Sequence, residues 1–476
     1  MTYISLNYYI LAAIALAIYY LVPMNFRWLV LLAADVAFIG FFGLYGLPLI
    51  LFTALISYIF ARILDGRKSK AVLWAGIILV TAPWLIVKLV PAAASYLPGS
   101  FSNLVSIIAP LGISFYTLQL VAYMVDIYKG RCESEKNFAK HLLFVTFFPQ
   151  LIQGPIPRYD LRDQLVEGHA FDAARFVRGF YLVIWGFFLK LMIADKLGVM
   201  VDTVYNNFPA YAGAYVWLAM AGYMIQLYAD FLACTTLARG VSYMFGITPG
   251  ENFRQPFLAQ SISEIWRRWH ISLSNWLKDY IYIPLGGNRK GTARKYINII
   301  ITFVVSGFWH GTGLNFLVWG LLNGLYQVIG ALTNSTRDKI YEVLHIPADS
   351  EYRKWIKRIG TFLLFSFSFI LFRADGLKTG LRMIKSMLVF NPWVLVSDRI
   401  FSLGLDGKEL VVLAISLVIL IAVELKQDKG EIICDRIARQ PVVARYILAL
   451  CAIAVVIIFG TYGYGFNSQD FIYGGF

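Results

Sequence analysis

His310 is the side chain of this sequence best placed for acid–base chemistry within a membrane. In the apolar hairpin Tyr296–Leu332 it is the only residue that is charged or titrates near neutral pH. It lies in the glycine-rich break Ser306–Gly313, after a first arm of roughly 21 Å of helix, less than the roughly 30 Å hydrocarbon core. We therefore expect His310 inside the membrane, where an ionisable residue is by default a functional candidate. A neutral histidine packed between helices is the structural alternative.

A second histidine, His270, follows a pair of arginines, Arg267 and Arg268, in the stretch Ser261–Pro284. The arginines can bind phosphate groups through charge-assisted hydrogen bonds. The stretch is too charged to cross a membrane but rich in Trp, Tyr, Ile and Leu, which is typical of a helix at the membrane surface. A structural role for His270 in such a helix is equally compatible with the sequence. The indoles of Trp266, Trp269 and Trp276 are expected to be interface anchors.

The composition identifies the class of protein that must position these residues. Of 476 residues, 59% are hydrophobic, 16% aromatic and only 15% charged, which indicates a multi-spanning membrane protein and excludes a soluble one. The net charge of +14 comes from short basic clusters between apolar runs, as in cytoplasmic loops, and does not indicate a nucleic-acid partner. The four cysteines have no CxxC spacing, which argues against a disulfide framework or a zinc site.

The apolar runs predict an all-α polytopic protein of about 12 crossings in a single domain, 1–476, with N-terminal spans in 1–100, a core with both histidines in 101–345 and C-terminal spans in 346–476. The runs lie near 5–22, 28–44, 47–63, 71–90, 104–127, 176–193, 213–232, both arms of 296–332, 359–372, 409–425 and 443–461. A further run, 138–156, is broken by Pro, Gly and Gln and is expected to be re-entrant.

The basic loops set the predicted orientation. Arg62–Lys70 and Lys129–Lys140 are rich in Lys and Arg, whereas Val201–Tyr215 has neither, so the first two are expected in the cytoplasm and the third outside. This count places both termini outside. The loop Arg373–Lys408 is basic although the count makes it external, and longer loops obey the rule less strictly.

Two motifs resemble one family. Ser263–Arg289, which contains His270, and Phe308-Trp309-His310-Gly311 are similar to the membrane-bound O-acyltransferase (MBOAT) superfamily, in the branch of bacterial alginate O-acetylases and teichoic acid D-alanyl transfer proteins. The match is specific and covers most of the chain. It implies a ring of about 11–12 transmembrane helices, with re-entrant and interfacial helices, around a central funnel that joins a cytoplasmic donor to an external acceptor.

The resemblance assigns roles to the motif residues. It makes His310 the catalytic histidine, and an imidazole can take a proton from an attacking hydroxyl. His270 is the second motif histidine. The side chains expected to bind the donor or substrate are Arg267, Arg268, Trp309, Asn288, Lys278 and Asp230.

One motif departs from the family. Related chains commonly read Asp-Phe-Ser-Gly-x-x-Asp, whereas this chain reads Asp230-Phe-Leu-Ala-Cys-Thr-Thr236. The first aspartate remains. Asp230 is either an intramembrane carboxylate paired with a cation or a group at the inner end of its helix, and the second interpretation is preferred.

The C-terminal sequence Phe471-Ile-Tyr473-Gly-Gly-Phe476 resembles an aromatic motif of the same branch. The resemblance implies that Tyr473 receives the acyl group and passes it on, which is chemically reasonable because a phenyl ester is an activated acyl donor. An aromatic anchor at the outer interface is the alternative.

We therefore expect a bacterial inner-membrane acyltransferase with no bound cofactor. The family implies acetyl-CoA or an acyl carrier protein thioester as donor, an envelope polysaccharide as acceptor, and an extracytoplasmic hydrolase-like partner. Acetyl transfer is favoured over D-alanyl transfer because the tyrosine motif is part of this chain. A transporter or flippase is the alternative of another class, but the chain shows no inverted repeat. A scaffold for envelope enzymes is a third.

Overall fold

The computed structural model describes residues 3–42, 44–93 and 112–462, and its regular structure there is helical throughout. The helices are α1 (Leu6–Leu21), α2 (Arg27–Phe42), α3 (Leu47–Gly66), α4 (Lys70–Ala92), α6 (Ile113–Tyr128), α7 (Phe138–Thr146), α8 (Tyr159–Val166), α9 (Ala173–Phe188), α10 (Asp195–Asn206), α11 (Ala214–Met244), α12 (Ile262–Arg268), α13 (Ile271–Leu277), α14 (Thr292–His310), α15 (Leu314–Leu332), α16 (Asn334–Val343), α17 (Glu351–Arg373), α18 (Gly376–Ser386), α19 (Gly407–Asp428), α20 (Ile433–Ala438) and α21 (Val442–Phe459).

The protein is a multi-pass membrane protein, as predicted. Eight helical segments of the described ranges are long and apolar enough to cross a membrane. They are Met24–Phe41, Leu44–Gly66, Lys70–Val90, Ala173–Asn206, Ala214–Met244, Leu314–Leu332, Glu351–Arg373 and Val442–Phe459. Of the remaining predicted crossings, three contain the helices α1, α14 and α19, and α6 forms the described part of the run 104–127.

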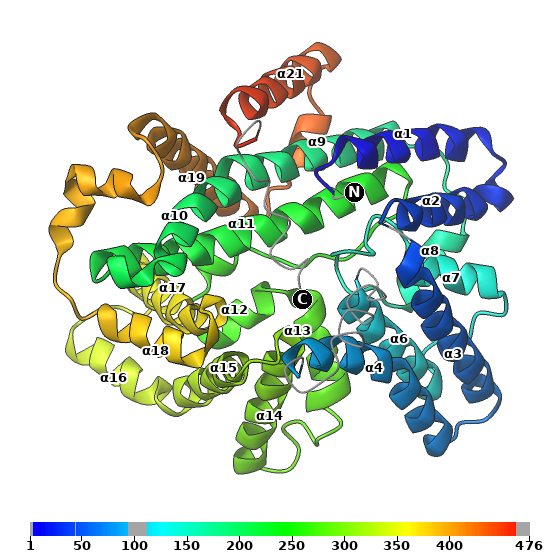
Figure 1. The fold of residues 1–476 in the computed structure, drawn as a ribbon, viewed down its shortest axis with the longest axis horizontal. Coiled ribbons are helices and arrows are strands. Elements are labelled where there is room, and N and C mark those ends of the chain that lie inside the picture. Colours follow the sequence, from blue (N-terminus) through cyan, green and yellow to red (C-terminus); the bar gives the residue numbers. More distant parts are fainter. Residues whose placement is uncertain (1–2, 43, 94–111, 463–476) are drawn as a thin grey trace.

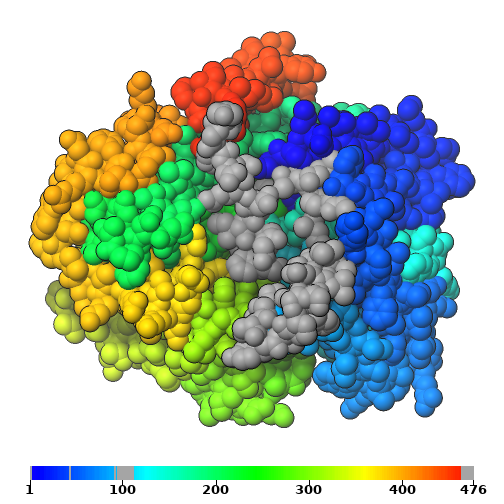
Figure 2. All heavy atoms as spheres, viewed as in Figure 1, coloured from blue at the N-terminus to red at the C-terminus, as the bar shows by residue number. Residues whose placement is uncertain are grey.

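The helices are arranged around a central region (Figure 1). The N-terminal helices α1 to α4 form one side, α14 and α15 follow, and α16 to α19 form the side opposite α1 to α4. The short helices α12 and α13 lie in the interior, and the long helices α9 and α11 pack along each other. The surface shows the same order, with the yellow and orange segments opposite the blue N-terminal side and the red C-terminal helix α21 beside the N-terminal segment (Figure 2). This arrangement agrees with the expected ring.

Hydrogen bonds join the basic loops on one face. The Lys68 ammonium donates to the carbonyl of Ile127 over 2.7 Å, and the Ser134 hydroxyl donates to Asp65 over 2.8 Å. On the other face, the amide of Gly213 donates to the carbonyl of Ser386 over 2.9 Å. The predicted outer loops, Val201–Tyr215 and the basic Arg373–Lys408, therefore lie together.

The run 138–156 enters and leaves at the same face, as predicted. It forms the short helix α7 and then a buried, non-helical return. Beyond the return, the Arg162 guanidinium donates to the carbonyl of Glu133, just before α7, over 2.7 Å. Within the fold, Asp35 of α2 accepts bonds from the Phe148 amide at 2.8 Å and the Thr146 hydroxyl at 3.0 Å. The protein thus satisfies irregular backbone that lipid could not.

Asp230 lies in the middle of α11, which continues to Met244, and not at a helix end. Its carboxylate is buried and pairs with the Lys190 ammonium at 2.8 Å, and Lys190 also pairs with Asp195 at 2.9 Å. Lys190 lies in a π-helical turn that joins α9 to α10. The preferred interpretation of Asp230 as a helix-end group is therefore wrong, and the alternative of a buried pair with a cation is correct.

Candidate functional site

His310 is the last residue of α14, where glycines stop the helix and start the next one. Gly311 leaves the helix with extended backbone, and Gly313 caps the first turn of α15. The two helices then pack at very short range. A Cβ on Gly307 would lie 2.3 Å from the carbonyl oxygen of Phe316, so only glycine allows this approach. The glycine-rich break thus fixes the place of His310.

The His310 imidazole is 2% exposed and surrounded by aromatic rings. Its centroid lies 4.8 Å from that of Trp309, 5.2 Å from that of Trp319 and 5.2 Å from that of Phe372. The ammonium of Lys88, on α4, donates a hydrogen bond to the main-chain carbonyl of Trp309. This bond satisfies one of the last carbonyls of α14 and brings a cation to the helix end.

His270 lies near the same indole. It caps α13 with left-handed backbone, φ 43°, and its ring is 6.1 Å from Trp309 and 4.7 Å from Phe231. Asn252 holds the following turn, since its carbonyl accepts the Ile271 amide at 2.9 Å. The structure thus brings both predicted histidines together around Trp309.

His270 is 1% exposed, so it is buried within the protein. Burial lowers the pKa of the His270 imidazole to about 3, and the ring is neutral at physiological pH. A buried neutral imidazole can donate or accept a hydrogen bond but is not an anchor for phosphate.

The three tryptophans of this stretch are buried, and the prediction that they anchor the chain at the interface is wrong. Trp266 Nε1 donates to Asn323 at 3.3 Å, and Trp276 Nε1 donates to the Leu118 carbonyl at 2.8 Å. Trp269 stacks among Tyr228 and other aromatic rings of the core. Their spacing therefore reflects packing against protein helices and not contact with the headgroups.

A polar cleft of about 670 Å³ lies beside this centre. Ile271 and Ser272, directly after His270, form part of its wall. Three cations also line it, Arg158, Arg254 and Lys278. Asp160, Glu251 and Asp279 line it as well, and Asp279 pairs with Arg158 and Glu251 with Arg254, so the cleft has the size of a small-molecule site and carries both charges.

The buried end of the cleft carries an amide without a partner. Gln150 is 5% exposed, and neither atom of its amide has a hydrogen-bond partner in the described part of the chain. The Ser272 hydroxyl, on the same wall, also has none there. Such groups indicate a ligand with hydrogen-bonding atoms along its length, because buried polar groups are normally paired.

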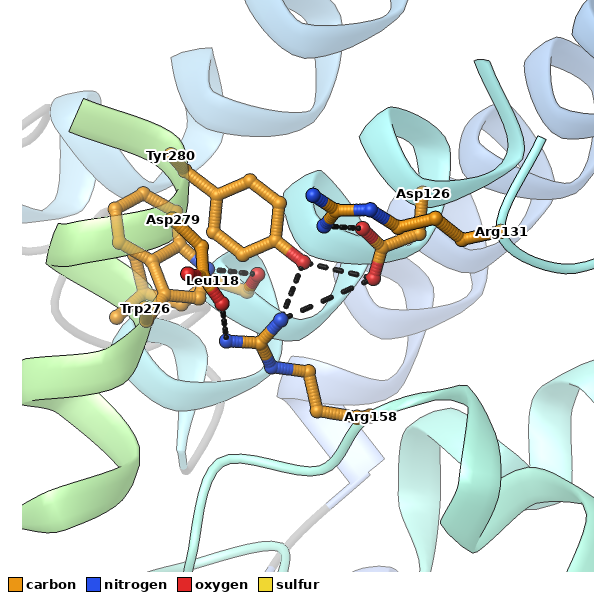
Figure 3. Close-up of polar contacts among 7 residues, drawn as sticks. All are labelled: Leu118, Asp126, Arg131, Arg158, Trp276, Asp279 and Tyr280. Carbon is orange, nitrogen blue, oxygen red and sulfur yellow. Dashed lines mark hydrogen bonds and ion pairs between the residues drawn. The ribbon is translucent and has the colours of Figure 1, made fainter. Parts of the chain in front are cut away.

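Arg158 is held at the rim of the cleft by a network that joins three segments (Figure 3). Its guanidinium donates to Asp279 at 3.0 Å and to the Tyr280 hydroxyl at 2.8 Å. Tyr280 in turn donates to Asp126 of α6 at 2.7 Å, and Arg131 pairs with the same carboxylate at 2.8 Å. Burial raises the pKa of Tyr280, and the hydrogen bond to Asp126 raises it further.

The predicted binding residues divide into two groups. Lys278 lines the cleft and Trp309 contacts both histidines. The others lie elsewhere: Arg268 pairs with Glu264 and Asp428, Arg267 and Asn288 are exposed and do not line the cleft, and Asp230 pairs with Lys190. Their assignment to the donor site is not supported. Tyr473 lies outside the described residues.

Sequence reasoning missed Gln150, Arg158 and Lys88. The sequence predicts the break in the run 138–156, but it does not mark Gln150 within the run or Arg158 just after it as ligands of a substrate. Lys88 is the one cation inside the apolar run 71–90, and that signal was available.

Comparisons with known proteins point the same way. Residues 134–372 match the membrane-bound O-acyltransferase family. A probable alginate O-acetylase of Pseudomonas fluorescens is 35% identical over 84% of this chain and 78% of its own length. A peptidoglycan O-acetyltransferase of Helicobacter pylori is 34% identical over 60% of this chain and 58% of its own. A teichoic acid D-alanyltransferase of Bacillus subtilis is 30% identical over 46% of this chain and 58% of its own.

Proposed function

Because the chain belongs to the membrane-bound O-acyltransferase family and is an acyltransferase, we propose that it moves an acetyl group from a cytoplasmic thioester to a hydroxyl of an envelope polysaccharide. The observation that carries the proposal is the placement of His310, buried at the broken end of α14 and joined through Trp309 to His270 and the polar cleft. The names of the acetylating relatives support the acetyl group and the polysaccharide acceptor.

His310 acts as the general base. Its neutral imidazole removes the proton of the acceptor hydroxyl while the hydroxyl oxygen forms a bond to the thioester carbonyl carbon. The carbon–sulfur bond then breaks, and the leaving thiolate takes up the proton that His310 holds. The aromatic rings around His310 exclude water, which limits hydrolysis of the thioester.

The test is His310→Ala in purified protein reconstituted into vesicles. Transfer from acetyl thioester should fall by about 10²–10⁴-fold, because general-base catalysis contributes that much. His345→Ala is the matched control, since His345 is exposed on the loop after α16. A folded His310→Ala protein with the activity of wild type would disprove the role. Consumption of the thioester also separates an acyltransferase from a transporter, which leaves the donor intact.

We infer that the donor's phosphopantetheine arm, shared by CoA and carrier proteins, lies in the polar cleft. Its amides match the amide of Gln150 and the hydroxyl of Ser272, and its phosphate matches Lys278, since Arg158 and Arg254 already pair with Asp279 and Glu251.

Charge reversal tests this placement. Lys278→Glu should raise the KM for the donor about tenfold with little change in kcat, because the ammonium binds and does not react. Lys290→Glu, on the exposed loop before α14, should change neither. Equal effects of the two substitutions would show a general effect of charge, and a fall in kcat alone would place Lys278 in catalysis or structure.

D-alanyl transfer to teichoic acid is the alternative within the family, and the D-alanyltransferase of Bacillus subtilis is the more distant relative by identity and coverage. Acetyl-CoA and a D-alanyl carrier protein, offered in parallel, distinguish the two donors. Turnover of the carrier protein alone would overturn the acetyl assignment.

We also propose that Tyr473 carries the acyl group onward to an extracytoplasmic hydrolase-like partner, with the protein in the bacterial inner membrane and both termini outside. Tyr473→Phe keeps the ring and removes the hydroxyl, so it should abolish transfer to polymer while Tyr473→Ala does no further harm. If the tail is only an anchor, Tyr473→Phe is silent and Tyr473→Ala is harmful. Mass spectrometry of the C-terminal peptide would detect the acyl-tyrosine.

A further inference from the structure

An apolar groove of about 410 Å³ lies between α4, α6, α13 and α14. Its walls are almost entirely aliphatic and aromatic, and they include Ile77, Trp84, Val121, Trp276 and Val305. Trp276 and Tyr280 line the groove, whereas Lys278 and Asp279 of the same segment line the polar cleft. This segment, which carries Trp276, Asp279 and Tyr280 in Figure 3, therefore lies between the two cavities. The groove is thus distinct from the cleft in place and in chemistry.

The groove faces the lipid side of the protein. Trp74 lines it and is 62% exposed, and the adjacent Ile78 is 61% exposed. In a membrane protein, such apolar exposure means contact with hydrocarbon. The two walls belong to separate packing units, because α4 packs on α3 and α6 while α14 packs on α15.

The length of the groove matches one leaflet. On α4 it extends from Leu73 to Trp84, roughly 16 Å of helix, and one leaflet contributes roughly half of a 30 Å hydrocarbon core. Hydroxyl groups of Ser114 and Thr117 mark its inner end. An acyl chain of a membrane lipid therefore fits from end to end.

The end of the groove at the basic loop Lys129–Lys140 is positively charged. Lys129 lines it there, with its ammonium 5.8 Å from the Tyr280 ring. The nearby carboxylates already have other cations, since Asp126 pairs with Arg131 and Asp279 pairs with Arg158 (Figure 3). The three cations Lys129, Arg131 and Arg158 thus face the two carboxylates of Asp126 and Asp279. One positive charge remains at the mouth of the groove for a phosphate.

We propose that the groove binds an anionic phospholipid, with one acyl chain between α4 and α14 and the phosphate beside Lys129. A basic mouth beside an apolar groove between helices is the combination that recognises such lipids. The site is independent of the acyl-transfer proposal, because it lies on the other side of Trp276 and needs neither histidine. Its inner end reaches Trp309, so the lipid packs against the residue whose indole lies near both imidazoles.

Native mass spectrometry of the full chain tests this site. The protein is delipidated in detergent and then offered equimolar phosphatidylglycerol and phosphatidylcholine. Wild type should retain one phosphatidylglycerol with about a five-fold preference, as one lysine near the headgroup provides. Ile77→Trp fills the groove and should lose this lipid, whereas Ile78→Trp, the outward neighbour, should keep it.

The charge arm uses Lys129→Glu, which should abolish the preference while the fold is unchanged, and Lys136→Glu, an exposed lysine of the same loop, as control. This arm remains decisive if Ile77→Trp fails to fold. Equal retention by Ile77→Trp and Ile78→Trp, or no preference in wild type, would show an adventitious lipid only and overturn the proposal. Displacement of the lipid by pantetheine thioester would assign the groove to the donor instead, and would also overturn it.

Discussion

Gly307→Ala tests whether the close contact of α14 and α15 positions His310. The new Cβ would lie 2.3 Å from the carbonyl oxygen of Phe316. The contact is reciprocal, because a Cβ on Gly320 would lie 2.3 Å from the carbonyl oxygen of Phe303. Both obstacles are main-chain atoms, so no side-chain rotation relieves them, and the helices must separate.

The expected loss follows from the size of that separation. Real Cβ atoms essentially never come closer than 3.0 Å to such an atom, so α14 must shift by roughly 1 Å. His310 is three residues further along the same helix and moves with it. A misplacement of about 1 Å at a reacting group costs about 10²-fold in rate, and the overpacking itself costs about 1–3 kcal/mol of stability.

The assay is the initial rate of acetyl transfer from a thioester by vesicles of known protein content, with thermal unfolding measured in parallel. Gly330→Ala is the control, since it lies on α15 and a Cβ there meets no atom within 4 Å. It should retain full activity. A well-folded Gly307→Ala protein with the wild-type rate would refute the reasoning, and so would an equal loss in Gly330→Ala.

Five further substitutions at four residues test polar groups inside the fold. Lys190→Met leaves two buried carboxylates without their cation and should cost about 3–5 kcal/mol in thermal unfolding, whereas Asp230→Asn keeps the pair with Asp195 and should cost less. Below about pH 6.5 the His270 imidazole of the unfolded chain takes up a proton, whereas the imidazole of the folded chain stays neutral down to about pH 3. The free energy of unfolding should therefore fall as pH falls through this range, and His270→Gln should flatten that slope. Lys88→Met removes the bond to the Trp309 carbonyl and should lower the rate about tenfold, while Lys88→Arg should restore most of it.

The sequence carries enough local information to predict the hairpin and the re-entrant segment. Glycines around His310 and the Pro, Gly and Gln residues after Phe147 interrupt runs that are otherwise continuously apolar. Such breaks act on the backbone of their own segment, so a local pattern suffices to find them. The two motifs that contain His270 and His310 are likewise short, continuous stretches of sequence, so they can be found without knowledge of distant contacts.

Contacts between distant segments were not predictable in this manner. Lys190 lies 40 residues before Asp230, and only the π-helical turn directs its ammonium at that carboxylate. The tryptophans near His270 have the composition of an interface, but composition does not tell whether an indole faces headgroups or other helices. Arg268, predicted to bind phosphate, pairs with Glu264 on its own helix and with Asp428, and this second partner is 160 residues away.

Trp309 connects the separate parts of the site. Its indole lies near both imidazoles, its carbonyl accepts a hydrogen bond from Lys88, and its side chain lines the apolar groove. A close-packed interior transmits a displacement of one such ring to the groups it touches. A lipid in the groove therefore presses on the same residue that positions His310, and the lipid composition of the membrane should affect the acyl-transfer rate through Trp309. Trp309→Phe replaces the indole with a smaller ring. The acyl-transfer rate of this variant should depend less on the phosphatidylglycerol content of the vesicles than the rate of the wild type does.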